Sequence, residues 1–241
     1  MTTAGTQTFG GAVTLGSNVT LATTNSAVEF QNTLNSEANE DNNLTINAGS
    51  GAVTFDGVIG GATNGELGDL VVNSTDKTWF KSSVTAGSVA TNAGGTLQIG
   101  GGSVTTTGAM SFGEAMTLGA DTTLNVTGLA AGAINLDNGG SSYNLTIAEA
   151  GTGAVSGIIS GGGAMTSSGA GTLTLTDTNT YTGNTTISDA SGTLVIANDA
   201  PSTQSASFFG PGALRIESVA GSFTNPLTYS SADWAFDATL G

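Results

Sequence analysis

A short triplet, in which one polar or small residue separates two apolar ones, recurs along this 241-residue chain and commonly ends near Gly, Asn or Asp. Successive side chains of a β-strand point to opposite faces, so such a triplet buries two side chains and exposes the one between them. Strong helix formers are scarce, and Gly, Thr, Asn and Ser interrupt the chain every few residues. The sequence therefore predicts an all-β fold of short strands. The triplets lie at 13–15, 19–21, 28–30, 44–46, 53–55, 97–99, 124–126, 145–147, 173–175, 194–196 and 214–216.

The chain also repeats itself over a long distance. Residues 2–21 align without gaps on residues 105–124, with 11 of 20 positions identical, and the similarity continues at nearly the same offset. This pattern predicts internal units at about 2–104 and 105–207, each roughly 103 residues long. The aromatic-richer residues 208–241 are expected to form terminal coils or a cap. We expect all of residues 1–241 to form one continuous β-solenoid segment.

Two architectures fit the strand spacing. Each unit forms an immunoglobulin-like β-sandwich in one of them, giving a two-bead array. In the other, each unit forms four or five coils of a right-handed parallel β-helix, with Gly or Asn at the corners and stacked Val, Leu, Ile and Ala inside. The strands are short, aromatic residues make up only 6% of the chain, and no linker marks the join near Thr105. These features favour the β-helix.

Composition excludes several classes of function. The chain has no Cys, no His, 3 basic and 18 acidic residues, and a net charge of −15. Such a chain cannot neutralise a run of phosphates, so nucleic-acid binding is not expected. No run of about 18 apolar residues is present, so we expect no membrane insertion of this segment. Residues 1–5 lack the basic and apolar regions of a signal peptide, which suggests either that one was removed or that this is an excised segment.

One segment carries a family resemblance. Residues 169–196 read GAGTLTLTDTNTYTGNTTISDASGTLVI and resemble the passenger-associated transport repeat of bacterial autotransporters. In that repeat, G-x-G-x-L-x-L precedes N-T-Y-T-G-x-T-T-I and then G-x-L-x-I. The chain departs from the pattern at Ser167 and Ser168, where the family commonly has Lys, and at the small insertion 189–191. The matching positions are Gly169, Gly171, Leu173, Leu175, Asn179, Thr180, Tyr181, Thr182, Gly183, Thr185, Thr186, Ile187, Gly192, Leu194 and Ile196.

The rest of the chain resembles, more loosely, the β-strand repeats of large secreted bacterial adhesins and haemagglutinins. The resemblance implies an extracellular right-handed β-helix that is exported through an outer-membrane pore by a type V or related route. A cysteine-free chain of local repeats suits such export, because each coil folds by stacking on the previous one and no disulfide must form first.

Candidate sites for chemistry are few. Some parallel β-helices process polysaccharides with carboxylates and basic residues on one sheet. The residues of this chain that most resemble such a set are Asp56, Asp69, Asp76, Lys77 and Lys81. Asp56 and Asp69 adjoin glycines, as turn residues commonly do, so we predict no catalytic residue. Calcium on Asp177, Asp189 and Asp199 is possible in principle, but no calcium motif supports it. We therefore predict no metal site and no cofactor.

Three further features are interpreted as structural. The alternate threonines from Thr172 to Thr182 are expected on an exposed strand face rather than in a ligand-binding row. The Asn-x-Ser/Thr sequons at Asn18, Asn43, Asn73, Asn125, Asn144 and Asn184 are expected by chance in a chain rich in Asn and Thr. The late aromatic residues predict a cap or a docking surface; they are Phe208, Phe209, Phe223, Tyr229, Trp234 and Phe236.

These observations predict a non-enzymatic structural or adhesive segment of a large bacterial surface or secreted protein. The expected partners are neighbouring repeats or identical subunits, joined through strand edges, and host or matrix glycans or proteins. One alternative is a self-assembling filament or surface-layer subunit joined end to end by strand pairing, since no cap is recognisable at the amino end. The other alternative is a polysaccharide-processing β-helix enzyme.

Overall fold

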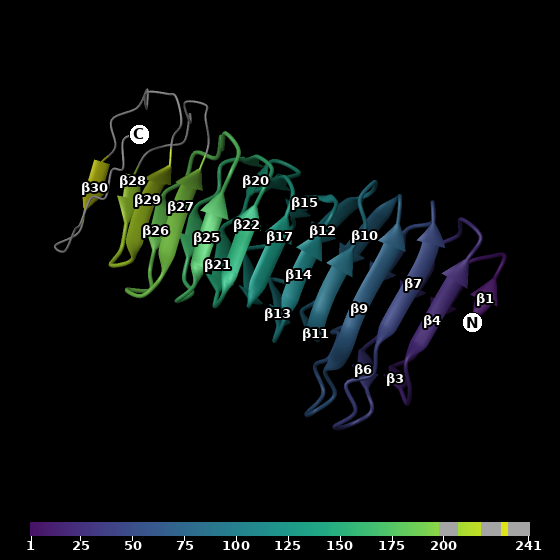
Figure 1. Ribbon diagram of the computed structural model, residues 1–241. Helices are drawn as coiled ribbons and strands as arrows, with labels where there is room; N and C mark the ends of the chain where they lie inside the picture. Colours follow the sequence, from purple (N-terminus) through teal and green to yellow (C-terminus); the bar gives the residue numbers. More distant parts are fainter. Residues whose placement is uncertain (198–206, 218–227, 231–241) are drawn as a thin grey trace.

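Parallel strands stack along the whole described part of the chain. The computed structural model describes residues 1–197, 207–217 and 228–230. This part contains strands and no helix, and its coils form a β-solenoid of about ten turns (Figure 1). The predicted parallel β-helix is thus confirmed. The two-sandwich alternative is wrong, because immunoglobulin-like sandwiches are built from antiparallel pairs, whereas the pairs here are parallel except in one small hairpin.

Each full coil contributes one segment to each of three faces. The first sheet begins the coil, and its strands pair in register from Gln7 to Ile159. It contains β2 (Gln7–Phe9), β5 (Val28–Phe30), β8 (Val53–Phe55), β10 (Lys77–Phe80), β12 (Thr96–Ile99), β15 (Ala115–Leu118), β18 (Ile134–Asn135) and β23 (Ile159–Ser160).

The second sheet follows the first around the coil. Ile59 replaces a strand in the third coil and bridges Leu34 and Val84. The sheet contains β3 (Val13–Leu15), β6 (Leu34–Ser36), the first part of β11 (Val84–Thr91), β13 (Ser103–Thr106), β16 (Thr122–Val126), β21 (Leu145–Glu149), β24 (Met165–Ser167), β26 (Thr185–Ile187), β28 (Ser207–Phe209) and β30 (Thr228–Ser230).

The third sheet closes each coil. Strand β11 turns the corner without a break, since its first part pairs with β13 and its last part pairs with β14. The sheet contains β1 (Thr2–Thr3), β4 (Val19–Thr23), β7 (Leu44–Gly49), β9 (Leu67–Ser74), the last part of β11, β14 (Ala109–Phe112), β17 (Gly128–Ala131), β22 (Thr152–Val155), β25 (Thr172–Leu175), β27 (Thr193–Ala197) and β29 (Ala213–Glu217).

The core is a set of side-chain columns along the solenoid axis. Phe9, Phe30, Phe55 and Phe80 stack face to face with ring centroids 4.7, 5.2 and 5.4 Å apart. Ile99 continues this column in register above Phe80. Offset-stacked rings and aliphatic side chains exclude water from the interior, so every coil is stabilised by the coils on either side.

Coil length varies while the register holds. Register partners are 18 residues apart at Met116 and Ile134 but 25 apart at Val28 and Val53. Longer coils place the extra residues outside the core. One such excursion is the antiparallel hairpin of β19 (Asp137–Asn138) and β20 (Ser141–Ser142). Asp137 Oδ1 accepts a hydrogen bond of 2.8 Å from Gly162 N, and this bond together with one from Ser142 lowers the pKa of Asp137.

The sequence repeat does not correspond to a repeat of faces. Residues 7–9 lie on the first sheet, whereas the matching residues 110–112 lie on the third. Likewise 13–15 lie on the second sheet and the matching 116–118 on the first. Copies of one segment thus serve on different sides of the solenoid, because all three sheets need the same pattern of buried and exposed residues.

Candidate functional site

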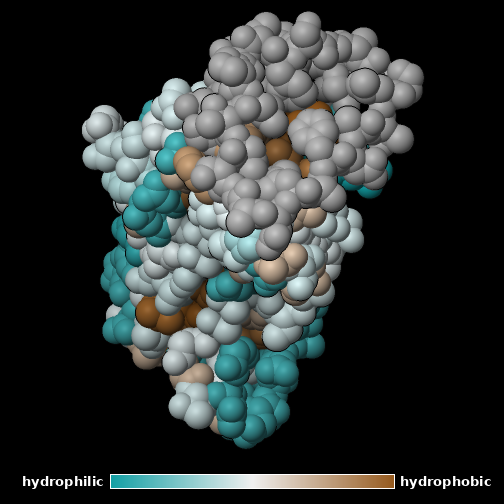
Figure 2. Space-filling view, turned by 90° about the vertical axis from the view of Figure 1, so that its left-hand side faces the viewer, coloured by the Kyte–Doolittle hydropathy of each residue, from teal (hydrophilic) through white to brown (hydrophobic). Residues whose placement is uncertain are grey.

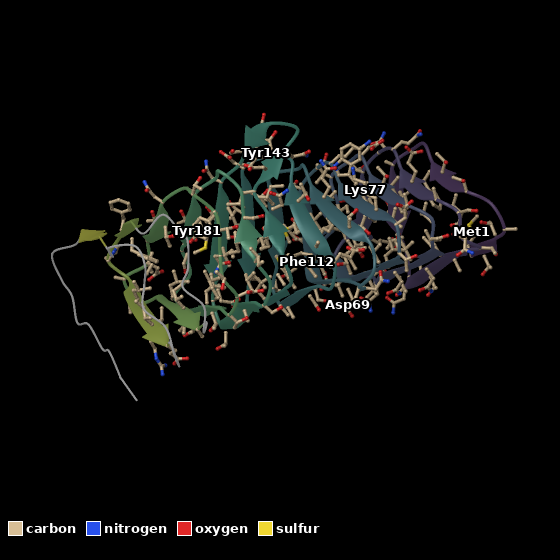
Figure 3. All side chains as sticks on the ribbon, turned by 90° about the horizontal axis from the view of Figure 1, so that it is seen from above. Met1, Asp69, Lys77, Phe112, Tyr143 and Tyr181 are labelled. Carbon is tan, nitrogen blue, oxygen red and sulfur yellow. The ribbon has the colours of Figure 1, made fainter. Side chains whose placement is uncertain are left out.

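Sequence pattern places two lysines and a tryptophan on the outside of the first sheet. Thr78 and Phe80 of β10 point inward and are fully buried, so the alternating residues Lys77, Trp79 and Lys81 point outward. Figure 3 shows Lys77 and Asp69 on opposite long sides of the molecule.

The ammonium groups of both lysines lie over the indole ring of Trp79. Lys77 Nζ is 3.8 Å and Lys81 Nζ is 4.3 Å from the centre of the indole ring, which are cation–π distances. Lys81 Nζ also lies 2.6 Å from Asp56 Oδ1, one coil away. We call Asp56, Lys77, Trp79 and Lys81 the tryptophan patch.

The indole nitrogen of the patch lacks a hydrogen bond. Within the described part of the chain, Trp79 Nε1 is buried and has no hydrogen-bond partner. A Cβ atom on Gly100, in the next coil, would lie 3.5 Å from this nitrogen. The register neighbours of Trp79 are Thr54 and Gln98, so the indole has polar side chains on both sides along the axis.

The structure brings together only some of the five residues that were considered for polysaccharide chemistry and predicted to be non-catalytic. Asp56, Lys77 and Lys81 meet in the tryptophan patch. Asp69 lies on β9 of the third sheet, where its Oδ1 accepts a hydrogen bond of 2.7 Å from Ser88. Asp76 occupies the turn before β10, where its backbone carbonyl accepts a bond from Thr96 N. Asp69 and Lys77 therefore cannot act on one substrate bond.

The two described residues among those considered for calcium, Asp177 and Asp189, belong to local turns. Asp177 Oδ1 accepts a hydrogen bond from Thr178 N, and Asp189 Oδ1 accepts one from Ser191 N. Asp199 lies outside the described residues. Within the described ranges, no three Asp or Glu side chains gather closely enough to hold a metal ion.

Two buried carboxyl groups lie at corners of the coils. Glu149, 1% exposed, accepts hydrogen bonds of 2.9 Å from Leu129 N and Gly151 N, so it stabilises two backbone groups. Glu114, 2% exposed, accepts a long hydrogen bond of 3.4 Å from Thr78 Oγ1 at its Oε1 and has a second weak interaction with the hydroxyl of Thr91, whereas its Oε2 lacks a hydrogen bond of good geometry. Burial raises the pKa of Glu114 to about 6.

The residues of the transport-repeat motif shape a coil that lacks a strand on the first sheet. Asn179 and Tyr181 are fully buried. Asn179 Oδ1 accepts a hydrogen bond of 2.8 Å from Ile159 N, and the Tyr181 hydroxyl lies 2.5 Å from Thr185 Oγ1. The intervening Thr180 is exposed but lies outside any strand. The predicted strand face is therefore confined to Thr172 and Thr174 of β25, which are half-buried, and is wrong for Thr176 to Thr182. The conspicuous motif residues thus have packing roles.

Most sequon asparagines use their side chains between coils. Asn43 Oδ1 accepts a bond of 2.6 Å from Asp69 N, and Asn73 Nδ2 donates to Asn47 Oδ1 at 2.8 Å. Asn18, Asn125 and Asn144 make similar bonds. These asparagines therefore have a structural use that needs no glycan.

Few large apolar side chains reach the described surface. Phe209 is 37% exposed, while Phe208 beside it is buried. Phe223, Trp234 and Phe236 lie outside the described residues, as does the side chain of Tyr229. Figure 2 shows a surface on which hydrophilic and intermediate side chains surround small apolar patches. No helix in the described ranges has the length and apolar character required to cross a bilayer.

Sequence reasoning identified the two lysines but missed Trp79. The sequence did hold this information, because Lys77, Trp79 and Lys81 alternate with Thr78 and Phe80 and must therefore share one face of the strand.

The fold places this chain among parallel β-solenoid proteins. Comparisons with protein-family models, curated proteins and solved structures find no match.

Proposed function

We propose that this chain is a non-enzymatic, extracellular structural or adhesive segment of a large bacterial surface or secreted protein. In this role, the solenoid is a rigid stalk or an exported passenger domain, and the solvent-facing sides of its sheets contact the binding partners. The observation that carries the proposal is the unbroken parallel stacking of about ten coils around one buried core. Such a rod presents long, flat surfaces at a fixed spacing.

The family resemblance supports the extracellular assignment. Residues 169–196 fit the transport repeat of autotransporter passengers, and Asn179 and Tyr181 perform definite packing roles within it. Cysteine-free coils that stack one upon another also suit export before folding. Type V export to the cell surface is therefore part of the proposal.

Surface display tests this function. The chain is placed between a secretion signal and an outer-membrane translocator in a non-adherent bacterium, and the translocator alone is the control. We expect the folded chain outside the cell and increased attachment to other cells or to a polysaccharide-coated surface. A displayed, folded chain that leaves attachment at the control level would overturn the proposal.

The enzymatic alternative is tested with the same protein. We expect no shortening of acidic polysaccharides during long incubation, because Asp56, the one candidate carboxylate beside the lysines, is paired with Lys81, and Asp69 lies on the third sheet. Chain cleavage that is lost in Asp69→Asn or Lys77→Ala would contradict the non-enzymatic role.

Open strand edges favour end-to-end assembly as a second candidate function. In the described part of the chain, β2 pairs only with β5 and β3 only with β6, so one edge of each of these two strands is unpaired, whereas β4 pairs with both β1 and β7. Phe9 and Val13 are only partly buried there. Unpaired edges can pair with another chain. Negative-stain microscopy would show ordered polymers if this is the function and separate particles if it is not.

A further inference from the structure

We propose that the tryptophan patch binds a polyuronate, an acidic polysaccharide whose sugars carry carboxylates. This inference rests on the proposed contact role and names the class of ligand. Charge, unsatisfied hydrogen bonding and the spacing of the coils each support it.

Charge is the first argument. The chain has only three basic residues and a net charge of −15, yet two of those residues flank one indole ring. The third, Arg215, pairs with Glu217. Lys81 pairs with Asp56, whereas Lys77 has no carboxylate within 4 Å in the described ranges. Lys77 is thus an unneutralised cation, and one ligand carboxylate would give it a charge-assisted hydrogen bond. The patch pairs a single carboxylate in this way, which is a smaller demand than the run of phosphates that the chain cannot neutralise.

The indole supplies the second argument. Two lysine ammonium groups lie over the ring, and Lys77, which has no carboxylate partner, can move aside and let the C–H face of a sugar ring pack against the aromatic surface. Trp79 Nε1 is buried and unpartnered in the free state. Because the nitrogen is buried, a ligand oxygen reaches it only when the side chains around the ring move aside, and accepting its hydrogen bond then removes the cost of an unsatisfied donor.

The spacing of the coils is the third argument. Outward residues of the first sheet form a row along the axis, with Thr54 before Trp79 and Gln98 and Thr117 after it. Neighbouring strands lie about 4.8 Å apart. A 1,4-linked sugar advances by a similar length, so a polysaccharide that runs from Thr54 past Trp79 towards Thr117 meets a hydroxyl or amide side chain in the coils beside the tryptophan. Glu29, the register neighbour before Thr54, carries a carboxylate and limits an acidic ligand in that direction.

Calorimetric titration of the full chain with an oligogalacturonate tests the inference. A neutral malto-oligosaccharide of the same length is the ligand control. We expect binding of the acidic oligosaccharide only, and weaker binding at high salt. Lys77→Gln and Trp79→Ala should each weaken binding about tenfold or more, since each removes a main contact. Arg215→Gln, which removes the same charge elsewhere, should bind as the parent does.

Four outcomes would overturn the inference. They are no binding of the acidic oligosaccharide, equal binding of the neutral one, equal losses in Lys77→Gln and Arg215→Gln, and patch-dependent binding of anionic lipid vesicles in place of the sugar. Thermal unfolding of each variant checks that it is folded, and Trp79→Phe supplies a milder change at the ring. If the sugar fails to bind while the displayed chain still promotes attachment, only the ligand assignment fails.

Discussion

At the residue scale, buried polar side chains form hydrogen bonds with the backbone at places where the strands of successive coils do not pair. Glu149 and Asn179 are both buried, and each accepts hydrogen bonds from backbone N–H groups. Glu114 differs because one of its carboxylate oxygens lacks a hydrogen bond of good geometry. Buried polar groups stabilise a fold when they are satisfied and destabilise it when they are not.

Glu114 should make the stability of the protein depend on pH. Its pKa is about 6 in the folded protein against 4.5 as the ordinary value, so the folded state binds more protons between these values. The protonated Glu114 therefore contributes to the free energy of unfolding in full below pH 4.5, and this contribution is lost as the pH rises through 6. The pKa difference corresponds to about 2 kcal/mol. Glu114→Gln should therefore gain about 2 kcal/mol relative to the parent between pH 4.5 and pH 7.5 in denaturant unfolding.

The exposed Glu37→Gln is the matched control for this experiment. It should show little change in its stability difference from the parent over the same range. Equal pH responses in the two variants would show that burial does not perturb Glu114.

Asn179 should be needed for the coil that lacks a strand on the first sheet. Asn179→Ala removes the acceptor of the buried Ile159 N–H, and an unsatisfied buried donor costs about 1–3 kcal/mol. Denaturant unfolding should show this loss, while Thr180→Ala, one residue away and exposed, should change stability by less than about 0.5 kcal/mol. Similar values for both variants would refute a specific role for the amide.

At the element scale, some corners of successive coils are in direct backbone contact. A residue at such a corner has no room for a side chain. A Cβ atom on Gly101 would lie 2.0 Å from the carbonyl carbon of Ser82. A Cβ atom on Gly11, by contrast, would meet nothing within 4 Å. Glycine is therefore required by contact between coils at some corners and is replaceable at others.

Alanine substitutions at these two glycines measure that difference. Gly101→Ala must push two coils apart, so we expect it to lower the free energy of unfolding by about 3 kcal/mol or more. Gly11→Ala should stay within about 0.5 kcal/mol of the parent. A mild effect at Gly101 would mean that the corners are not in close contact.

The strands were predictable from sequence because the triplet pattern is local. All eleven triplets lie in strands, from 13–15 in β3 to 214–216 in β29. The position of Trp79 outside the core was readable from the same alternation. The partner of a strand was not readable, because coil lengths vary and the matching segments 7–9 and 110–112 occupy different sheets. Asn179 was recognised as a motif position, but its hydrogen bond to Ile159 N was not predictable because that partner lies in the previous coil.

At the scale of the whole molecule, the function proposed here depends on rigidity. About ten coils share one core, and outward residues of the first sheet follow one line from Thr8 to Ser160. A rod of this kind holds its contacts at fixed spacing, whereas a chain of separate beads would not. The position of the tryptophan patch on that line is what gives a long polysaccharide several coils to contact.

The distance between spin labels at Thr8→Cys and Ser160→Cys is the most direct test, and the absence of native Cys makes the labelling specific. Seven strand spacings separate these residues, so their backbones should lie about 34 Å apart. Labels at Thr8→Cys and Gln98→Cys, four spacings apart, should give about 19 Å. Narrow distributions in this proportion are the predicted result. Broad distributions, or distances that do not grow with the number of coils, would contradict the rigid solenoid.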